Sequence, residues 1–433
     1  MRKRNIFVTI LACILSTGVY AQQMSLKDLF TIAEENSEQL RINRTAVSSA
    51  EEGIKSAKAA KLPEVGVEVS IGYLGDGKLG DRDFSNWQHI DNPHFMNNFA
   101  VKASQVIYTG GAIKSGIRLA ELGKDMAELT LQNNRQEVRF VIAGQYLAIC
   151  RLQNQRRVIE ENIALTDTII ANTKVRVAEG TALDNDITRY ELQRENLLLE
   201  KRRLSDALDI FRHQLGTTLH TDLTGVEFSI DGNIASTLAN RSENDWQSDA
   251  LQSNIGLKQA EKAINLSELQ LKLKKSDLLP KIAVIAENHF DGPITIEVPV
   301  IDKNFNYWFA GIGVQYQLSS LWKSKKDVNK ARIDVRQAQE QRNLAQEGIN
   351  RAVQAAYTNL LTSEAELNMR QKSVQLALEH YDVTLNRYNN GLCLLTDMLD
   401  AASTRLSSET ALVNARIDII YNYYQLKYLT SSL

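Results

Sequence analysis

The stretch Arg387–Asp397, RYNNGLCLLTD, decides the fold because an earlier stretch, Arg176–Asp186, RVAEGTALDND, repeats its layout. The Arg, the Gly and the final Asp of the two stretches are each 211 residues apart. The dipeptide Leu62–Pro63 recurs as Leu279–Pro280, at a separation of 217 residues. A duplication of this length predicts a tandem pair of one large unit and argues against a catalytic domain with an accessory domain.

Proline is confined to two short regions, around residues 63–93 and 280–299. An interior proline costs a helix about 3 kcal/mol, so the proline-free spans between and after these regions allow very long helices. The longest would extend on the order of 100 Å. We expect helices at about residues 25–61, 112–179, 184–215, 245–278, 322–390 and 396–428.

The second half carries a coiled-coil pattern. Steps of four and three residues alternate without a break from Val353 to Tyr388, and most of these positions are apolar. The final helix has the same spacing at Val413, Ile417, Ile420 and Tyr424. Gly180 and Gly391 follow the two long helices, where a helix end favours a left-handed residue. The sequence therefore predicts two antiparallel helical hairpins with tips at 180–184 and 391–397.

Four segments alternate apolar with polar or small residues, at about 64–73, 98–108, 281–290 and 307–318. Each has about ten residues, the length of a transmembrane β-strand. The alternation alone is equally consistent with two surface hairpins on a periplasmic protein. We interpret 22–215 as the first repeat, 216–242 as a connector with room for one short strand, and 243–433 as the second repeat.

Residues 1–21 have the features of a secretory signal peptide: a basic start, an apolar stretch and a small-residue cleavage site at Val19–Ala21. Ile10–Cys13 also resembles a lipoprotein cleavage box, which leaves a lipidated Cys13 as the second possibility. No later stretch reaches 18 apolar residues, so the sequence predicts no transmembrane helix.

Composition and motifs argue against several functions. Cleavage of the signal lowers the formal charge from −2 to about −5, which gives no support for nucleic-acid binding. Cys150 and Cys393 lie in opposite halves and do not suggest a disulfide framework. His89 and His94, in a polar loop, are interpreted as surface residues and not as metal ligands. With no phosphate-binding loop and no nucleophile elbow, we expect no enzyme, no cofactor and no metal.

Four strands are too few for a closed membrane barrel, and an open sheet edge in lipid leaves backbone groups unsatisfied. Three copies of the chain would supply twelve strands under cyclic symmetry. Other numbers of copies would also supply enough strands for a closed barrel, but a trimer is the smallest assembly that leaves a channel.

Several motifs, in this order, resemble those of TolC-type outer-membrane efflux proteins. They are the Leu–Pro before strands one and three, Gln105–Gly111 after strand two, Tyr388–Gly391 and Asp397–Ala401. The resemblance covers nearly the whole mature chain. It implies a mainly α protein with membrane β: a homotrimer whose 12-stranded β-barrel in the outer membrane of a Gram-negative bacterium continues into a long periplasmic α-helical barrel. It also implies the exit duct of a tripartite efflux pump, partnered by a periplasmic adaptor and an inner-membrane transporter.

The resemblance places a periplasmic gate at the second tip, where Asp397 and Asp400 match the family's acidic rings. Three copies of each carboxylate around a narrow axis would repel one another and favour cations. The alternative is ordinary helix chemistry, with Thr396 or Asp397 capping the last helix and Asp400 favoured by the helix dipole. The two interpretations are compatible.

In some family members an Arg two residues after the tip Gly binds an Asp of the first hairpin. Here Cys393 occupies the Arg position, and the matching acceptor is Asp186. This departure leaves three options for Asp186: part of the gate, a helix cap, or a partner of Arg189 or Arg387.

The resemblance also assigns adaptor docking to small and apolar residues of the tips. These are Gly180, Thr181, Leu183, Gly391, Leu392 and Leu394. The alternative is a glycine helix end with its usual hydrophobic contact. For the whole chain, the competing functions are a type I protein-secretion duct and a periplasmic coiled-coil adaptor or scaffold.

Overall fold

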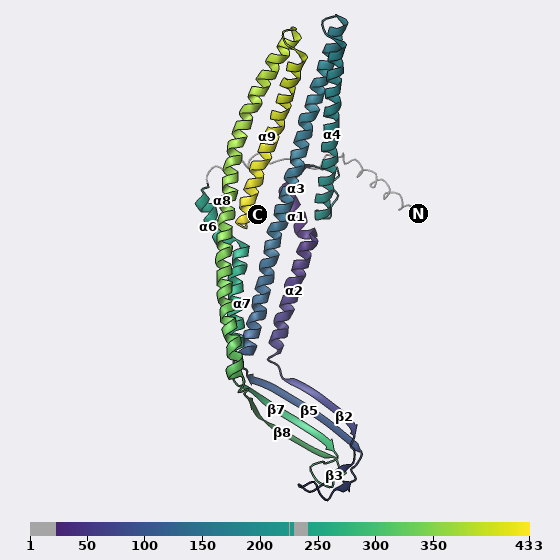
Figure 1. Cartoon of the computed structure of the whole chain (residues 1–433), viewed down its shortest axis with the longest axis vertical. Coiled ribbons are helices and arrows are strands. Elements are labelled where there is room, and N and C mark those ends of the chain that lie inside the picture. The colour runs from purple at the N-terminus through teal and green to yellow at the C-terminus, as the bar shows by residue number, and fades with distance from the viewer. Residues whose placement is uncertain (1–22, 225, 229–240) are drawn as a thin grey trace, which may run out of the picture. The chain divides into compact units, whose positions relative to one another are not determined.

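The computed structural model describes residues 23–224, 226–228 and 241–433 (Figure 1). The predicted signal peptide with Cys13, and much of the predicted connector, lie outside the described residues. The chain forms two compact units. Unit 1 contains the described residues up to Arg44 together with 130–258 and 345–433, and unit 2 contains 45–129 and 259–344.

The chain is mainly helical, as predicted. The helices are α1 (Leu26–Asn36), α2 (Glu38–Ala59), α3 (Ala112–Ala178), α4 (Asp184–Leu219), α6 (Glu243–Ser253), α7 (Ile255–Ser276), α8 (Ser320–Asn389) and α9 (Leu395–Leu429). The helices α2, α3, α7 and α8 contribute residues to both units. Among the described residues, no helix carries an apolar stretch suited to crossing a bilayer.

Two helices expected as single segments are each broken in two. Ser37 separates α1 from α2, and Asn254 separates α6 from α7, with extended ψ values of 120° and 121°. An extended residue interrupts the helical hydrogen-bond ladder, and the Asn254 side chain then accepts the Leu257 N–H (3.0 Å) at the start of α7. Ser37 and Asn254 are 217 residues apart, as are Ser25 and Ser242, the N-caps of α1 and α6.

Unit 1 is held by one large apolar cluster that draws on α1, α3, α4, α6, α8 and α9. Ile142 and Ile149 of α3 are buried in it, and so are Val353 and Leu360 of α8, each 211 residues later. A short parallel pair, β1 (Gln23–Met24) with β6 (Glu227–Phe228), lies in the same unit. Equivalent positions of the two halves thus supply the same core.

Polar contacts join α3 to α9 in unit 1. Arg151 Nη2 lies 2.5 Å from Asp418 Oδ1, and Gln155 Nε2 donates to Asn414 Oδ1 at 2.7 Å. The helical hairpins α3–α4 and α8–α9 therefore meet through α3 and α9, and α4 and α8 are the outer helices, as Figure 1 shows.

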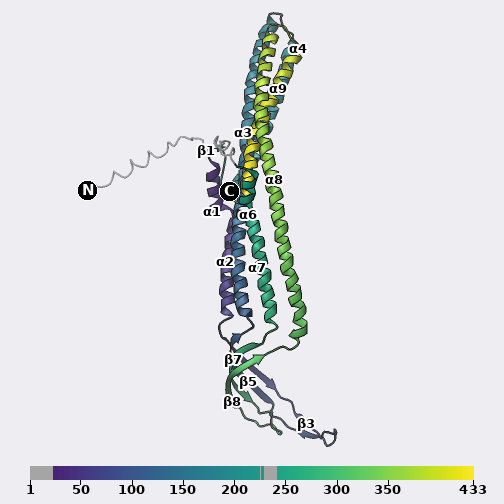
Figure 2. The same cartoon turned by 90° about the vertical axis from the view of Figure 1, so that its left-hand side faces the viewer.

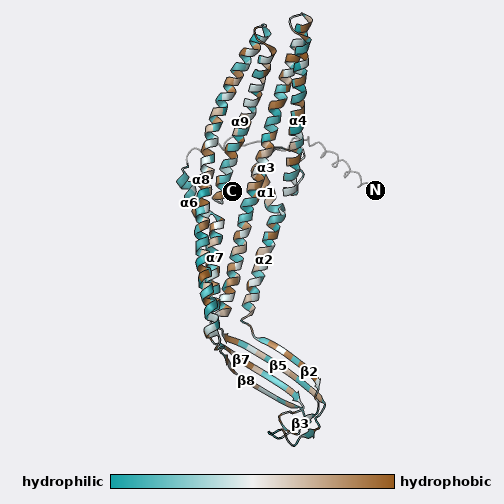
Figure 3. Cartoon of the chain, viewed as in Figure 1, coloured by the Kyte–Doolittle hydropathy of each residue, from teal (hydrophilic) through white to brown (hydrophobic). Residues whose placement is uncertain are grey.

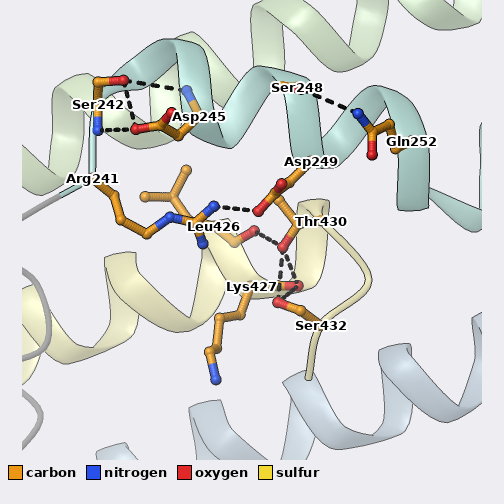
Figure 4. Close-up of polar contacts among 10 residues, drawn as sticks. All are labelled: Arg241, Ser242, Asp245, Ser248, Asp249, Gln252, Leu426, Lys427, Thr430 and Ser432. Carbon is orange, nitrogen blue, oxygen red and sulfur yellow. Dashed lines mark hydrogen bonds and ion pairs between the residues drawn. The ribbon is translucent and has the colours of Figure 1, made fainter.

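The end of α9 packs beside α6 (Figure 4). Ser242 and Asp245 form a capping box at the start of α6, in which the Ser242 N–H donates to Asp245 Oδ2 at 2.9 Å. Arg241 pairs with Asp249, and the Thr430 hydroxyl donates to a carbonyl of the preceding turn (3.1 Å) where α9 ends. The Thr430 bond closes the last turn of α9, and the other two contacts order the start of α6.

Unit 2 contains a four-stranded antiparallel sheet in the order β2–β5–β7–β8. Its strands are β2 (Glu64–Tyr73), β5 (Phe95–Tyr108), β7 (Lys281–Gly292) and β8 (Phe305–Gln315). Between β2 and β5, β3 (Gly77–Leu79) and β4 (Gln88–Ile90) form a separate two-stranded ribbon. Figure 2 gives a second view of these strands, and Figure 3 shows apolar and polar residues interleaved along them.

The register gives the sheet one apolar face and one polar face. Val67 pairs with Val101 and Val69 with Phe99, and the valines of β2 are exposed. The opposite face carries an ion pair between Lys102 Nζ and Glu68 Oε2 (2.6 Å), followed by Glu287, His289 and Asp291 of β7. A sheet with this asymmetry suits lipid on one side and water on the other.

Candidate functional site

The first hairpin tip is a Schellman turn. Gly180 has φ +71°, its N–H donates to Val177 O (2.9 Å), and the Thr181 N–H donates to Arg176 O (2.8 Å). The left-handed conformation needs glycine because a Cβ would be strained there. The chain then extends through Leu183 and enters α4.

The second tip repeats this geometry. Gly391 has φ +72°, its N–H donates to Tyr388 O (3.0 Å), and the Leu392 N–H donates to Arg387 O (2.8 Å). Leu394 precedes α9 as Leu183 precedes α4. Both tips therefore form the same turn, built from equivalent positions.

The predicted gate carboxylates divide into two kinds. Asp186 Oδ2 accepts the Leu183 N–H at 3.2 Å, and Asp397 Oδ2 accepts the Leu394 N–H at 3.0 Å. Each aspartate is the third residue of its helix and binds the N-cap backbone, which is half of a capping box. The N-cap of α9 is thus Leu394 and not Thr396 or Asp397, although Asp397 supplies the capping carboxylate. Asp400 is exposed one turn further along α9.

The latch position lacks a cation. Cys393 is half-buried, and its Sγ lies 3.6 Å from Thr384 O. Within the described residues, Asp186 forms no ion pair with Arg189 or Arg387, so its defined contact is the cap. The ion pair of Asp186 with Arg189 or Arg387, one of the three options from the sequence, is therefore not present in the described residues.

At the tips, the polar contact between the two hairpins is instead made by Arg176, which the sequence marks only as a repeated position. Arg176 Nη1 donates to Tyr388 O (3.1 Å), and its guanidinium lies 4.9 Å from the centre of the Tyr388 ring. Arg387, the equivalent residue of the second repeat, donates within its own tip to Leu392 O (3.4 Å). The repeat of Arg176 as Arg387 was the signal in the sequence that these positions matter. It did not show which of the two arginines contacts the other hairpin.

A small apolar core underlies the tips. Tyr190 of α4, Tyr381 and Tyr388 of α8, and Met398 of α9 are buried together. Tyr190 meets Tyr388 edge-on, with ring centres 6.3 Å apart. Burial raises the pKa of the Tyr190 and Tyr381 hydroxyls, so both stay protonated. This core makes the two tips one packed unit.

Residues of both tips line a cleft of about 610 Å³, among them Arg176, Asp186 and Cys393. Around it the apolar residues of the tips remain in solvent: Leu183, Leu392 and Leu394 are 69%, 68% and 70% exposed. Gly180, Gly391 and Thr181 are exposed as well. Three exposed leucines therefore surround the cleft at the tips.

Comparisons with known proteins agree with this architecture. The sequence model of the outer membrane efflux protein family matches residues 29–209 and 246–431. The outer membrane protein TolC of Escherichia coli (strain K12) is 22% identical over 438 residues, covering 94% of this chain and 82% of that protein. The proteases secretion protein PrtF of Dickeya chrysanthemi is 19% identical over 448 residues, covering 100% of this chain and 93% of PrtF.

The fold matches solved outer-membrane channels. The structure of the outer membrane protein VceC from Vibrio cholerae superposes with a TM-score of 0.75 at 15% identity, covering 94% of this chain and 96% of VceC. The duplicated helical hairpins and the small sheet are thus a known arrangement, and the predicted resemblance to TolC-type proteins is confirmed. The chain belongs to the outer membrane efflux protein family, and it is an efflux channel of the Gram-negative outer membrane, not an enzyme.

Proposed function

We propose that three copies of this chain form one closed duct, which serves as the exit of a tripartite efflux pump. The observation that carries the proposal is the sheet of unit 2. Within the described residues, its outer strands β2 and β8 each have one edge without a partner strand, and its apolar face is exposed. Unpaired backbone in lipid costs several kcal/mol per group, so the edges require strands from other copies.

Unit 1 gives independent support. The outer helix α8 exposes Met369, Leu376 and Val383, each seven residues apart. The other outer helix, α4, exposes Leu192 and Leu199 at the same spacing. Apolar residues every seven positions favour a coiled-coil seam with another helix. Different surfaces on α4 and α8 suit a head-to-tail contact, which closes into a ring.

The tips are the proposed contact with a periplasmic adaptor, which would link the duct to an inner-membrane transporter. The docking residues are Gly180, Thr181, Leu183, Gly391, Leu392 and Leu394. In the ring, we place Asp397, Asp400 and Asp186 around the periplasmic entrance as an acidic gate. The capping bonds of Asp186 and Asp397 each use one carboxylate oxygen and leave the charge in place.

The assembly is tested on protein extracted from membranes with a mild detergent. We expect a particle with the protein mass of three chains, and loss of dye efflux when the gene is deleted. Release by sodium carbonate, or a stable one-chain particle that is soluble without detergent, would contradict the duct.

Secretion of proteins is the second candidate, favoured by the full-length similarity to PrtF. The two functions differ in the inner-membrane partner. Recovery of the tips cross-linked to an adaptor that also binds a protein-exporting ATPase would favour secretion. The adaptor or scaffold alternative loses its support, since the family match covers both repeats.

A further inference from the structure

We propose that Asp76, His89 and Asp91 form a binding site for a divalent first-row transition cation of the Zn²⁺ type. The three residues lie in the loop between β2 and β5, on the ribbon formed by β3 and β4. From the sequence, His89 is interpreted as a surface residue, because its spacing from His94 matches no metal motif. The β3–β4 ribbon brings two more ligands, Asp76 and Asp91, close to His89, and the spacing of the histidines does not reveal them.

The register of the ribbon brings the carboxylates together. Lys78 pairs with His89 and Gly77 with Ile90, and Asp76 and Asp91 are the residues next to this last pair on the two chains. Two like charges this close at the end of a β-ribbon repel one another. A bound cation would remove that repulsion and tie the two strands together.

The distances fit one small cation. His89 Nε2 lies 3.0 Å from Asp91 Oδ1 and 3.8 Å from Asp76 Oδ2, and the three ligand atoms lie within 4.8 Å of one another. Metal–ligand bonds of about 2.0–2.2 Å in a tetrahedron separate ligand atoms by roughly 3.4 Å, which the first two distances bracket. Water would fill the fourth position. One neutral imidazole with two carboxylates carries charge −2 and favours Zn²⁺-like ions over Ca²⁺, which takes only oxygen.

Neighbouring groups hold the ligands in place. The Asn92 N–H donates to Asp76 Oδ1 (3.1 Å), which leaves Oδ2 on the His89 side. His94 Nδ1 is bonded to Leu74 O at 3.0 Å, so His94 supports the loop and is not a ligand through that atom. Such outer contacts orient ligands and raise metal affinity. The Lys78 ammonium would compete with the metal ion for the two carboxylates, because Lys78 pairs with His89 on the same face of the ribbon.

The test is Zn²⁺ titration of the detergent-purified protein by calorimetry, confirmed by competition with a coloured chelator. We expect one Zn²⁺ per chain, and His89→Asn or Asp91→Asn should weaken binding at least about 10-fold. The matched control is Asp83→Asn, an acid of the same loop whose carboxylate binds the Ser85 N–H (3.1 Å). Unchanged affinity in His89→Asn, or Ca²⁺ binding as tightly as Zn²⁺, would overturn the proposal.

A second readout uses trypsin, which cleaves after Arg82 in the same loop. Zn²⁺ should slow this cleavage in the native protein but not in His89→Asn, because a bound cation holds β3 to β4. Equal cleavage with and without Zn²⁺ would contradict the proposal. The location of this loop at the cell exterior rests on the proposed function. Zn²⁺ binding does not depend on that location. A one-chain particle that binds Zn²⁺ would therefore refute the duct and retain the site.

Discussion

Arg176 holds Tyr388 in two ways: it donates to the Tyr388 carbonyl at 3.1 Å and its guanidinium lies 4.9 Å from the centre of the Tyr388 ring. The hydrogen bond joins a charged donor to a backbone acceptor, and such bonds contribute about 1.5–3 kcal/mol. The ring contact adds roughly 0.5–1 kcal/mol. Since Arg176 belongs to the first hairpin and Tyr388 to the second, this pair resists their separation.

We therefore predict that Arg176→Ala loosens the tips and raises the conductance of single channels in planar bilayers. Arg387→Ala is the matched control, because Arg387 binds a carbonyl of its own tip. Equal conductance of the two variants would show that Arg176 does not restrain the entrance.

Adaptor docking through the tips predicts that Leu392→Asp combined with Leu394→Asp abolishes efflux while the protein still reaches the membrane. The reason is that a charge replaces an apolar contact at two exposed sites. Asn390→Asp adds charge at the same tip without removing a leucine, and should retain efflux. Dye accumulation and membrane fractionation measure the two effects. Gly391→Arg is less informative, because φ +72° strains any side chain there.

The exposed apolar residues at seven-residue spacing on α4 and α8 predict where neighbouring copies of the chain contact one another. Leu199→Glu or Leu376→Glu would bury a charge in the ring and should shift the particle toward single chains, as measured by light scattering. Glu379→Gln, close to Leu376 on α8, is the control and should leave the mass unchanged. Three-chain particles from both leucine variants would place the interface elsewhere.

The capping box of α6 predicts an acid-dependent loss of stability. Hydrogen bonds from Ser242 lower the pKa of the Asp245 carboxyl from its usual 3.8. A lowered native pKa stabilises the fold above the unfolded value, and this contribution disappears as the pH falls through the native value. Asp245→Asn should therefore reduce thermal stability at pH 7 more than at pH 2.5. A constant difference between these pH values would contradict the linkage.

Thiol reactivity gives a direct check on the core. Burial raises the pKa of the Cys150 thiol to about 12, so it stays protonated and unreactive at neutral pH. A thiolate-specific reagent should label Cys150 only after unfolding, and Cys150→Ala should remove the thiol that appears on unfolding. Cys393→Ala is the comparison, because Cys393 is half-buried at the tip. Labelling of Cys150 in the folded protein would contradict its burial.

The long helices, the turns and the strand alternation were readable in the sequence, because each depends on local chemistry such as proline exclusion or glycine at a left-handed position. Gly180 and Gly391 illustrate this: both have the expected positive φ. The breaks at Ser37 and Asn254 were not readable, since either residue is also common on the polar face of a helix.

The contacts at the site were less predictable, because they depend on which distant segments meet. Nothing in the order of residues shows that Arg176 contacts the other hairpin while Arg387 stays in its own. In the same way, the proximity of Asp76 to Asp91 appears only once the β3–β4 ribbon is known.

The sheet register also locates where the two repeats diverged in length. Glu64 pairs with Ser104, and Lys281 with Gln315, so the first members are 217 residues apart and the second members 211. The six-residue difference thus falls in the loops, where the first repeat carries β3 and β4. An inserted residue would rotate the rest of a helix by about 100° and misalign its buried stripe, whereas a loop absorbs it at small entropic cost. Evolution has thus been free to vary the strand-linking loops while the helical scaffold kept its phase.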